Sequence, residues 1–261
     1  MSRNEALQFI NVAHFFDHYF LLVFPTAALA IAPAWDMDYA DVLFLGSPVY
    51  ILFALGTLPA GWLGDRMDRM TLIGVFFLGC GMSSICVALA GSTLAMSIAL
   101  GSMGLFAAIY HPVGLALVTQ IGVRKGRALA VNGVYGNLGL AGAAVVTGIL
   151  ASQLGWQAAF YCPGGLSVLI GLVVFWRNRG SHVSPQEMAT VTTAVQPSGS
   201  RKTQIRIAVI VGVSALFGGL IFNAVTISLP KFFDERLVGP SDDLAWVGAS
   251  AGLVFAVAAF A

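Results

Sequence analysis

Two long stretches of the chain carry no formal charge, and they constrain the fold more than any other feature. No Lys, Arg, Asp or Glu occurs between Arg69 and Arg124, or between Arg127 and Arg177. The composition agrees, because 58% of the 261 residues are hydrophobic and only 10% are charged. A soluble domain has about a quarter of its residues charged. A chain with so few charges cannot cover its surface in water, so the sequence predicts a protein embedded in the bilayer.

The charge balance and the cysteines exclude several classes of partner. A formal net charge of +1 provides no basic field for nucleic acid and no acidic tail. The three cysteines lie in apolar stretches, where they resemble small buried hydrophobic residues and show no disulfide or zinc spacing: Cys80, Cys86 and Cys162. We therefore assign no nucleic-acid partner, no cofactor and no metal.

The apolar segments predict an all-α membrane protein. A helix needs roughly 20 apolar residues to cross about 30 Å of hydrocarbon. Seven segments meet this length: 7–33, 42–64, 71–90, 94–118, 128–151, 157–176 and 207–229. An eighth begins near Leu244 and is still apolar at Ala261. Where no charge separates two spans, we place the breaks at the turn-forming clusters Gly91-Ser92-Thr93 and Ser152-Gln153-Leu154-Gly155.

The basic residues predict the orientation of these spans, because cytoplasmic loops carry an excess of Lys and Arg. With the amino terminus in the cytoplasm, Lys231 and Arg236 lie outside. All other basic residues lie inside: Arg3, Arg66, Arg69, Arg124, Lys125, Arg127, Arg177, Arg179, Arg201, Lys202 and Arg206. We expect a multi-pass protein of the cell (inner) membrane with a cytoplasmic amino terminus.

One long polar segment divides the spans into two groups. Residues 177–206 are rich in Ser, Pro and charged residues, and they connect the sixth span to the seventh. We expect an N-terminal six-helix bundle at 1–176, a flexible cytoplasmic linker with a short helix around 185–189, and the start of a second bundle at 207–261.

The loop between the second and third spans carries a recognisable motif. It contains Gly61-Trp62-Leu63-Gly64-Asp65-Arg66-Met67-Asp68-Arg69, which resembles the cytoplasmic loop signature of the major facilitator superfamily of transporters. The matching residues are Gly61, Leu63, Gly64, Asp65, Arg66 and Arg69. The chain departs from the signature at Asp68, where the family usually has Gly, and at Met70, where a second basic residue is common.

This resemblance implies a fold of two six-helix bundles built from inverted three-helix repeats. It also implies that Asp65 caps a neighbouring helix and pairs with Arg127, or with Arg124, in a latch that holds the cytoplasmic side shut. The alternative is that the motif forms only a solvated, charge-balanced turn. Because a complete family member has twelve spans, we expect this chain to lack most of the second bundle, which full function would need.

Ionisable residues inside spans are costly and mark functional candidates. His14, Asp17 and His18 are spaced to lie on one face of the first span, and His111 in the fourth span lies at a similar depth. The resemblance implies that spans one, four and seven line a central cavity, which adds Asn223 on the seventh. In the alternative, His111 only bonds a carbonyl freed by Pro112 and His18 contacts only its neighbours.

The fifth span contains small residues at helical spacing. These predict close helix packing at a bundle interface: Gly133, Gly136, Asn137, Gly139 and Gly142. Together with His14-Phe15-Phe16-Asp17 and His111-Pro112, the segment Gly136-Asn137-Leu138-Gly139 locally resembles fosmidomycin-resistance exporters, which suggests proton-coupled efflux of a small anionic or drug-like compound.

The leading functional hypothesis is a proton-coupled secondary transporter of a small solute, with Asp17 as the titrating group. A second hypothesis is a metal-ion transporter or metal-binding membrane protein that uses His14, Asp17, His18 and His111 as ligands. A third is a receptor or assembly factor that kept the fold. We expect no enzymatic activity, because no nucleophile, zinc-protease motif or pair of aspartates is evident in the sequence.

Overall fold

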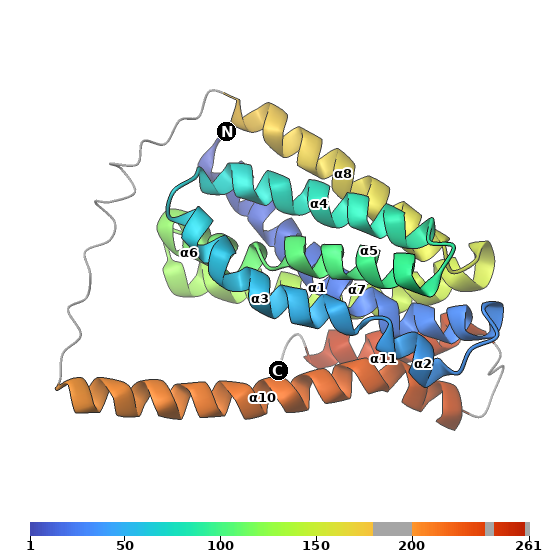
Figure 1. Cartoon of the computed structure of the whole chain (residues 1–261). Helices are drawn as coiled ribbons and strands as arrows, with labels where there is room; N and C mark the ends of the chain where they lie inside the picture. Colours follow the sequence, from blue (N-terminus) through green and yellow to red (C-terminus); the bar gives the residue numbers. More distant parts are fainter. Residues whose placement is uncertain (180–199, 238–242, 259–261) are drawn as a thin grey trace.

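The computed structural model describes residues 1–179, 200–237 and 243–258, and all regular secondary structure in these ranges is helical (Figure 1). Four of the first six spans are single uninterrupted helices: α1 (Arg3–Ala34), α4 (Arg69–Ala88), α7 (Lys125–Leu154) and α8 (Ala158–Asn178). The seventh span is α10 (Arg201–Arg236), and a shorter apolar helix, α11 (Leu244–Ala258), follows it.

The second and fourth spans are each broken into two helices. The pieces are α2 (Tyr39–Phe44) with α3 (Ser47–Gly64), and α5 (Thr93–Ala107) with α6 (Tyr110–Ile121). A proline ring clashes with the carbonyl four residues before it. Pro48 lies four residues after Phe44, and Pro112 lies four residues after Ala108, so each break lies where this clash falls. The second break places His111 in the first turn of α6.

The structure confirms the seven predicted spans and the position of the eighth. The predicted break at Gly91-Ser92-Thr93 also agrees, because the Ser92 side chain accepts a hydrogen bond from Ala95 N and begins α5. The other break lies later than predicted. The helix α7 continues through Leu154, and Gly155 ends it with a φ of 88°, a backbone conformation that glycine adopts readily.

The six spans of the first bundle pack in three pairs, α1 with α7, α3 with α5 and α4 with α8. Each pair joins one of the first three spans to one of the second three. If spans one, two and three are exchanged in order with spans four, five and six, the α1–α7 pair takes the place of the α3–α5 pair. The α4–α8 pair is then exchanged with itself. Inverted three-helix repeats produce this pattern.

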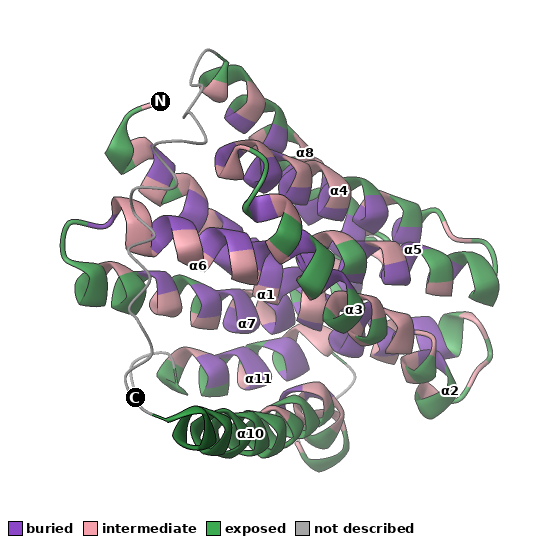
Figure 2. Ribbon diagram, turned by 60° about the vertical axis from the view of Figure 1, so that its left-hand side comes forward, coloured by how far each residue is buried: buried purple, intermediate pink, exposed green. Residues whose placement is uncertain are grey.

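The last two helices pack differently from one another. The helix α11 packs along α7, where an added Cβ at Gly248 would lie 2.4 Å from the Ala144 backbone oxygen. In contrast, residues 201–218 of α10 are exposed throughout, and Figure 2 shows α10 as a green helix next to α11, which lies between it and α7. Most of the predicted linker, including the short helix around 185–189, lies outside the described residues.

Candidate functional site

A buried carboxylate and a histidine form the centre of the candidate site. The Asp17 side chain on α1 is fully buried, and its Oδ2 atom lies 3.1 Å from His111 Nε2 on α6. Both carboxylate oxygens of Asp17 are buried, and neither has a partner with hydrogen-bond geometry in the described part of the chain. The His111 side chain is 36% exposed, so this pair connects the protein interior to a more open region.

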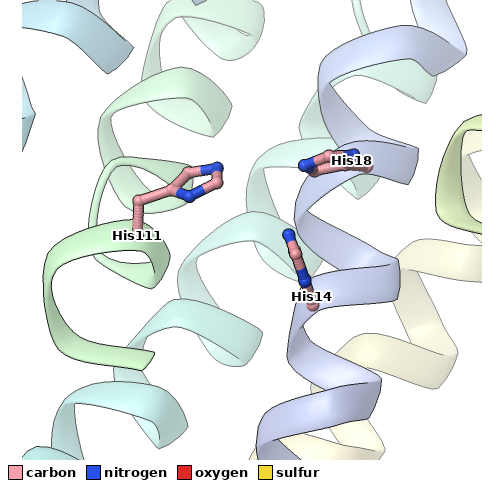
Figure 3. A group of neighbouring side chains, drawn as sticks. All are labelled: His14, His18 and His111. Carbon is pink, nitrogen blue, oxygen red and sulfur yellow. The ribbon is translucent and has the colours of Figure 1, made fainter. Parts of the chain in front are cut away.

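Two further histidines of α1 join this pair. The ring centroids of His14 and His18 are 4.7 Å apart, and each lies within 5.8 Å of the His111 centroid. Figure 3 shows the three rings gathered in the space between α1 and α6. The i, i+3 and i+4 spacing on α1 and the proline break before α6 therefore bring all four predicted ionisable residues together.

Sequence reasoning missed a polar network on the other side of His14. His14 Nδ1 lies 2.7 Å from the backbone oxygen of Asn132, which is fully buried on α7. The Asn132 side chain accepts a hydrogen bond from Tyr110 Oη (3.0 Å) and donates one to Asn11 Oδ1 (3.0 Å). Asn11 precedes His14 by three residues and Tyr110 precedes His111, so their helical positions were the available signal.

The small residues of α7 allow this close approach. An added Cβ would lie 2.6 Å from His14 Nε2 at Gly136, 2.2 Å from the Phe15 backbone oxygen at Gly139 and 2.7 Å from the Phe15 ring at Gly142. These three glycines thus face α1 within the first bundle. Gly133 faces open space, and Asn137 is half-buried.

A cavity of about 530 Å³ adjoins the histidine cluster. His18, Tyr50 and His111 form its polar wall on the first bundle, and Asn223 lies on the α10 wall. The Asn223 side chain donates to the Gly219 backbone oxygen at 2.9 Å. The remaining lining is mainly apolar and includes Leu21, Leu22, Phe53, Leu140, Leu220 and Phe222. The structure thus places the three predicted spans around one cavity.

The helix α10 contacts the first bundle near its carboxyl end. Lys231 Nζ lies 5.4 Å from the centroid of the Tyr39 ring on α2, and the Tyr39 hydroxyl donates to the Pro25 backbone oxygen at 3.2 Å. Lys231 also pairs with Asp234 and Glu235. Since residues 201–218 are exposed, α10 lies close to the first bundle at this end and apart from it at the other (Figure 1).

The loop motif forms different contacts from those that the resemblance implied. Asp65 is the C-cap of α3, its side chain is 74% exposed, and its Oδ1 atom lies 3.6 Å from Arg69 Nη2. No ion pair between Asp65 and either Arg127 or Arg124 forms within the described ranges. Arg127 is exposed on the first turn of α7 and lines a separate pocket with Arg124.

The other motif residues hold the loop against its neighbours. An added Cβ at Gly64 would lie 2.9 Å from the Val113 side chain on α6, and one at Gly61 would lie 3.6 Å from the Pro112 side chain. Leu63 is a half-buried part of the core. Arg66 lies over the Trp62 ring at 4.1 Å. The glycines therefore permit α3 to approach α6.

Helix capping is performed by Asp68, the residue at which the motif departs from the family pattern. Its Oδ2 atom accepts a hydrogen bond from Thr71 N (2.8 Å), which caps the start of α4. The same atom accepts one from Asn178 Nδ2 (2.6 Å), which links α4 to α8. The capping role expected of Asp65 is thus wrong for this structure. Asp65 follows α3, whereas Asp68 directly precedes α4.

The histidine cluster also contains the described residues best placed to hold a metal ion. One nitrogen from each of His14, His18 and His111 lies within 4.8 Å of the other two. Two nitrogens bound to one zinc ion at about 2.1 Å are at most about 4.2 Å apart. His14 also uses Nδ1 toward Asn132. The arrangement would have to contract before it could bind zinc.

Comparison with known proteins agrees with this architecture. Residues 9–261 match the family model described as Major Facilitator Superfamily. The chain is 31% identical over 165 residues to a tetracenomycin C resistance and export protein of Streptomyces glaucescens, an alignment that covers 59% of this chain and 30% of that protein. It is 31% identical over 154 residues to a puromycin resistance protein of Streptomyces alboniger, covering 57% and 28%. The aligned part of the chain thus spans less than a third of the length of these relatives.

Solved structures show the same fold. A bacterial homologue of the human lysosomal transporter Spinster, in an inward-facing and unoccupied conformation, superposes with a TM-score of 0.75 at 16% identity, covering 99% of this chain and 60% of that chain. A bacterial homologue of the human drug peptide transporters PepT1 and PepT2 gives a TM-score of 0.55 at 15% identity, covering 99% and 53%.

Proposed function

This chain belongs to the Major Facilitator Superfamily, and we propose that it binds substrate and transfers protons in a secondary transporter that works by alternating access. One observation carries the proposal. The fully buried carboxylate of Asp17 lies 3.1 Å from His111, which lines the cavity between the first bundle and α10. Such a pair can receive a proton from the cavity and hold it in the protein interior.

The free-energy cost of a buried charge on Asp17 can couple proton binding to movement of the first bundle. An unpaired charge at the centre of a span costs at least about 2.5 kcal/mol, so Asp17 is stable when it is paired with a protonated His111 or when it is itself neutral. When the proton on His111 passes to Asp17, both groups become neutral and the ion pair is lost, and His111 is then free to take another proton from the cavity. The first bundle then loses an electrostatic tie between α1 and α6, which lets it rock against the second.

The proposed substrate is a small drug-like organic compound, and the proposed direction is export. The cavity supports this class because its lining is mainly apolar, with His18, His111 and Asn223 available to orient a polar group. Two relatives at 31% identity are named as resistance proteins, one of them an export protein. A relationship to the fosmidomycin-resistance branch remains a prediction.

The test is proton-driven transport by the Asp17→Asn variant in vesicles that contain the protein. We expect a pH gradient to drive accumulation of a fluorescent drug-like cation or anion by the parent protein. Asp17→Asn should abolish this accumulation while leaving exchange at equal pH partly intact, because the amide cannot release a proton. Asp38→Asn is the matched control, because Asp38 is exposed and caps α2 without a side-chain hydrogen bond. Accumulation by Asp17→Asn that equals the parent would contradict the proton role.

We also propose that the amino terminus faces the cytoplasm of the inner membrane, and that 177–206 links the first bundle to the beginning of a second. The distribution of basic residues supports this orientation. A cysteine at Met37 should react with an impermeant thiol reagent from outside intact cells, and one at Lys202 should not. Reaction at Lys202→Cys in intact cells would reverse the orientation.

The metal hypothesis is the second candidate, and the gathering of three histidines supports it. It predicts that the parent protein binds zinc or nickel and that His18→Gln weakens this binding more than Tyr50→Phe does, because His18→Gln removes a ligand. In the parent protein the same ions should inhibit transport of the organic substrate. If metal affinity is unchanged when His14, His18 and His111 are replaced one at a time by Gln, this candidate is wrong.

A further inference from the structure

The His14 ring is held by groups from two neighbouring helices. On α7, the Asn132 backbone oxygen lies 2.7 Å from His14 Nδ1. On α6, the Tyr110 ring stacks on the imidazole with centroids 4.7 Å apart and an interplanar angle of 21°. Because His14 is 7% exposed, these contacts leave the ring little freedom to rotate.

The contact with Asn132 determines which ring nitrogen carries the proton. A carbonyl oxygen can only accept a hydrogen bond, so His14 Nδ1 must be the donor. A neutral imidazole carries one N–H, and its other nitrogen has the free lone pair. Neutral His14 therefore has its lone pair on Nε2, and a proton that reaches this ring is accepted there.

Asn132 is itself fixed by its side chain. The amide accepts from the Tyr110 hydroxyl and donates to Asn11, so α7 is tied to both α6 and α1 at the level of His14. The full burial of Asn132 and these two bonds set the position of its backbone oxygen. Asn132 thus acts on the proton site through His14.

Gly136 provides the space that Nε2 needs. An added Cβ at this position would lie 2.6 Å from His14 Nε2 and 2.7 Å from Cε1, closer than real Cβ atoms approach. Gly133, on the preceding turn of α7, has no atom within 4 Å of an added Cβ. The chain therefore contains both a test position and a matched control on one helix.

We infer that Asn132 and Gly136 are positioning residues that hold His14 as the Nδ1–H tautomer, so that Nε2 of His14 exchanges the proton of the Asp17–His111 pair. This inference rests on the proposed function. The titratable groups around His14 are Asp17 and His18 on α1 and Tyr110 and His111 on α6. On α4, the Cys80 thiol is directed to the Met103 backbone oxygen at 3.7 Å.

The experiment is nitrogen-15 NMR of histidine-labelled protein in lipid bilayers. The chain has four histidines, and a His14→Gln variant identifies the His14 signals by their loss. At a pH where the ring is neutral, we expect His14 Nδ1 to be protonated and Nε2 to be unprotonated. A neutral His14 that carries its proton on Nε2 would overturn the inference. This readout needs no transport, so it stands apart from a failure of the proposed function.

The variants then test the two positioning residues. Gly136→Ala should displace the ring and convert the single Nδ1–H signal to a mixture of tautomers, and it should alter the pH profile of transport. Gly133→Ala should leave both unchanged. Tyr110→Phe keeps the stacked ring and removes only the bond to Asn132, so it should produce a smaller share of the second tautomer. Unchanged His14 signals in both Gly136→Ala and Tyr110→Phe would show that neither residue positions the ring.

Discussion

The helices α1 and α10 are both long apolar spans, yet their surroundings in the structure differ. The polar side chains from Asn11 to His18 of α1 face protein, where Asp17 pairs with His111 and Asn11 bonds to Asn132. The first half of α10 is exposed along all its sides, and Asn223 farther along bonds to the backbone of its own helix. Hydropathy therefore identifies both helices as spans, whereas the contacts of their polar residues distinguish α1, which bonds to other helices, from α10, where Asn223 bonds within its own helix.

The two helices also differ in how closely their neighbours approach. Glycines of α7 bring its backbone against α1, and without a hydrophobic force between helices in lipid such close packing is a main source of association. On α10, Gly212, Gly218 and Gly219 have no atom within 4 Å of an added Cβ. Glycine thus permits close helix contact on α7, whereas these glycines of α10 contact no neighbouring helix.

The largest effect should come from filling the closest of these contacts. An alanine at Gly139 would place its Cβ 2.2 Å from the Phe15 backbone oxygen, which cannot move without shifting α1. Gly139→Ala should therefore cost about 1–3 kcal/mol or more, as overpacked cores do. Gly218→Ala should be neutral or stabilise by up to about 1 kcal/mol, since alanine favours helix. Thermal unfolding of both variants in one lipid–detergent mixture measures the difference, and equal losses of stability would remove the contrast between α1 and α10.

Much of this architecture could be predicted from the sequence because it depends on local composition. The span count follows from apolar length, and the meeting of His14, Asp17 and His18 with His111 follows from helical spacing and depth. The loop motif from Gly61 to Arg69 indicated the family through its six matching residues. In each case a short stretch of residues carries the physical cause.

Features that depend on the register between distant helices could not be predicted. Asn132 lies among small residues whose evident role is packing, and only the contact of α7 with α1 brings its carbonyl to His14. The breaks at Pro48 and Pro112 were also missed. Pro25 lies inside the unbroken α1, so a proline alone does not determine where a membrane helix ends.

The loop motif illustrates a further limit. The resemblance assigned capping and pairing to Asp65, and it treated Asp68 as a departure from the pattern. In the structure Asp68 caps α4 and binds Asn178, while Asp65 is largely exposed. The outcome depends on where α3 ends and α4 begins, because Asp65 directly follows α3 and Asp68 directly precedes α4.

A second prediction compares these two aspartates and has a smaller expected effect. Asp68→Ala removes a helix cap and a link to α8, so it should cost about 1 kcal/mol. Asp65→Ala removes an exposed ion pair, which should cost no more than about 0.5 kcal/mol. The latch hypothesis adds that Asp65→Asn lowers transport without changing stability. Unfolding and transport assays on the same preparations separate the two roles, and unchanged transport by Asp65→Asn would leave the motif as a turn.

The smallest expected effect concerns the one end at which α10 does contact the first bundle. Lys231 lies over the Tyr39 ring, and an exposed cation–π contact contributes about 0.5–1 kcal/mol. If this contact holds the outer side shut, Tyr39→Leu should raise access to the cavity from outside. The rate at which an impermeant thiol reagent labels a cysteine at Asn223 should then increase about two- to fivefold, which is the same free energy expressed as an equilibrium constant.

A matched control is Tyr161→Leu, because Tyr161 is an exposed tyrosine on α8, away from α10. In the Tyr161→Leu variant, the cysteine at Asn223 should be labelled at the same rate as in the parent protein. The background for these measurements replaces the exposed native cysteines Cys86 and Cys162 by serine, so that only the introduced thiol reacts. Equal rates in Tyr39→Leu and Tyr161→Leu would mean that the carboxyl-terminal half of α10 is held by its apolar contacts with α1 and α11 alone. In that case α10 would resemble a peripheral helix along its whole length, and the contrast with α1 would be sharper than the Tyr39–Lys231 contact suggests.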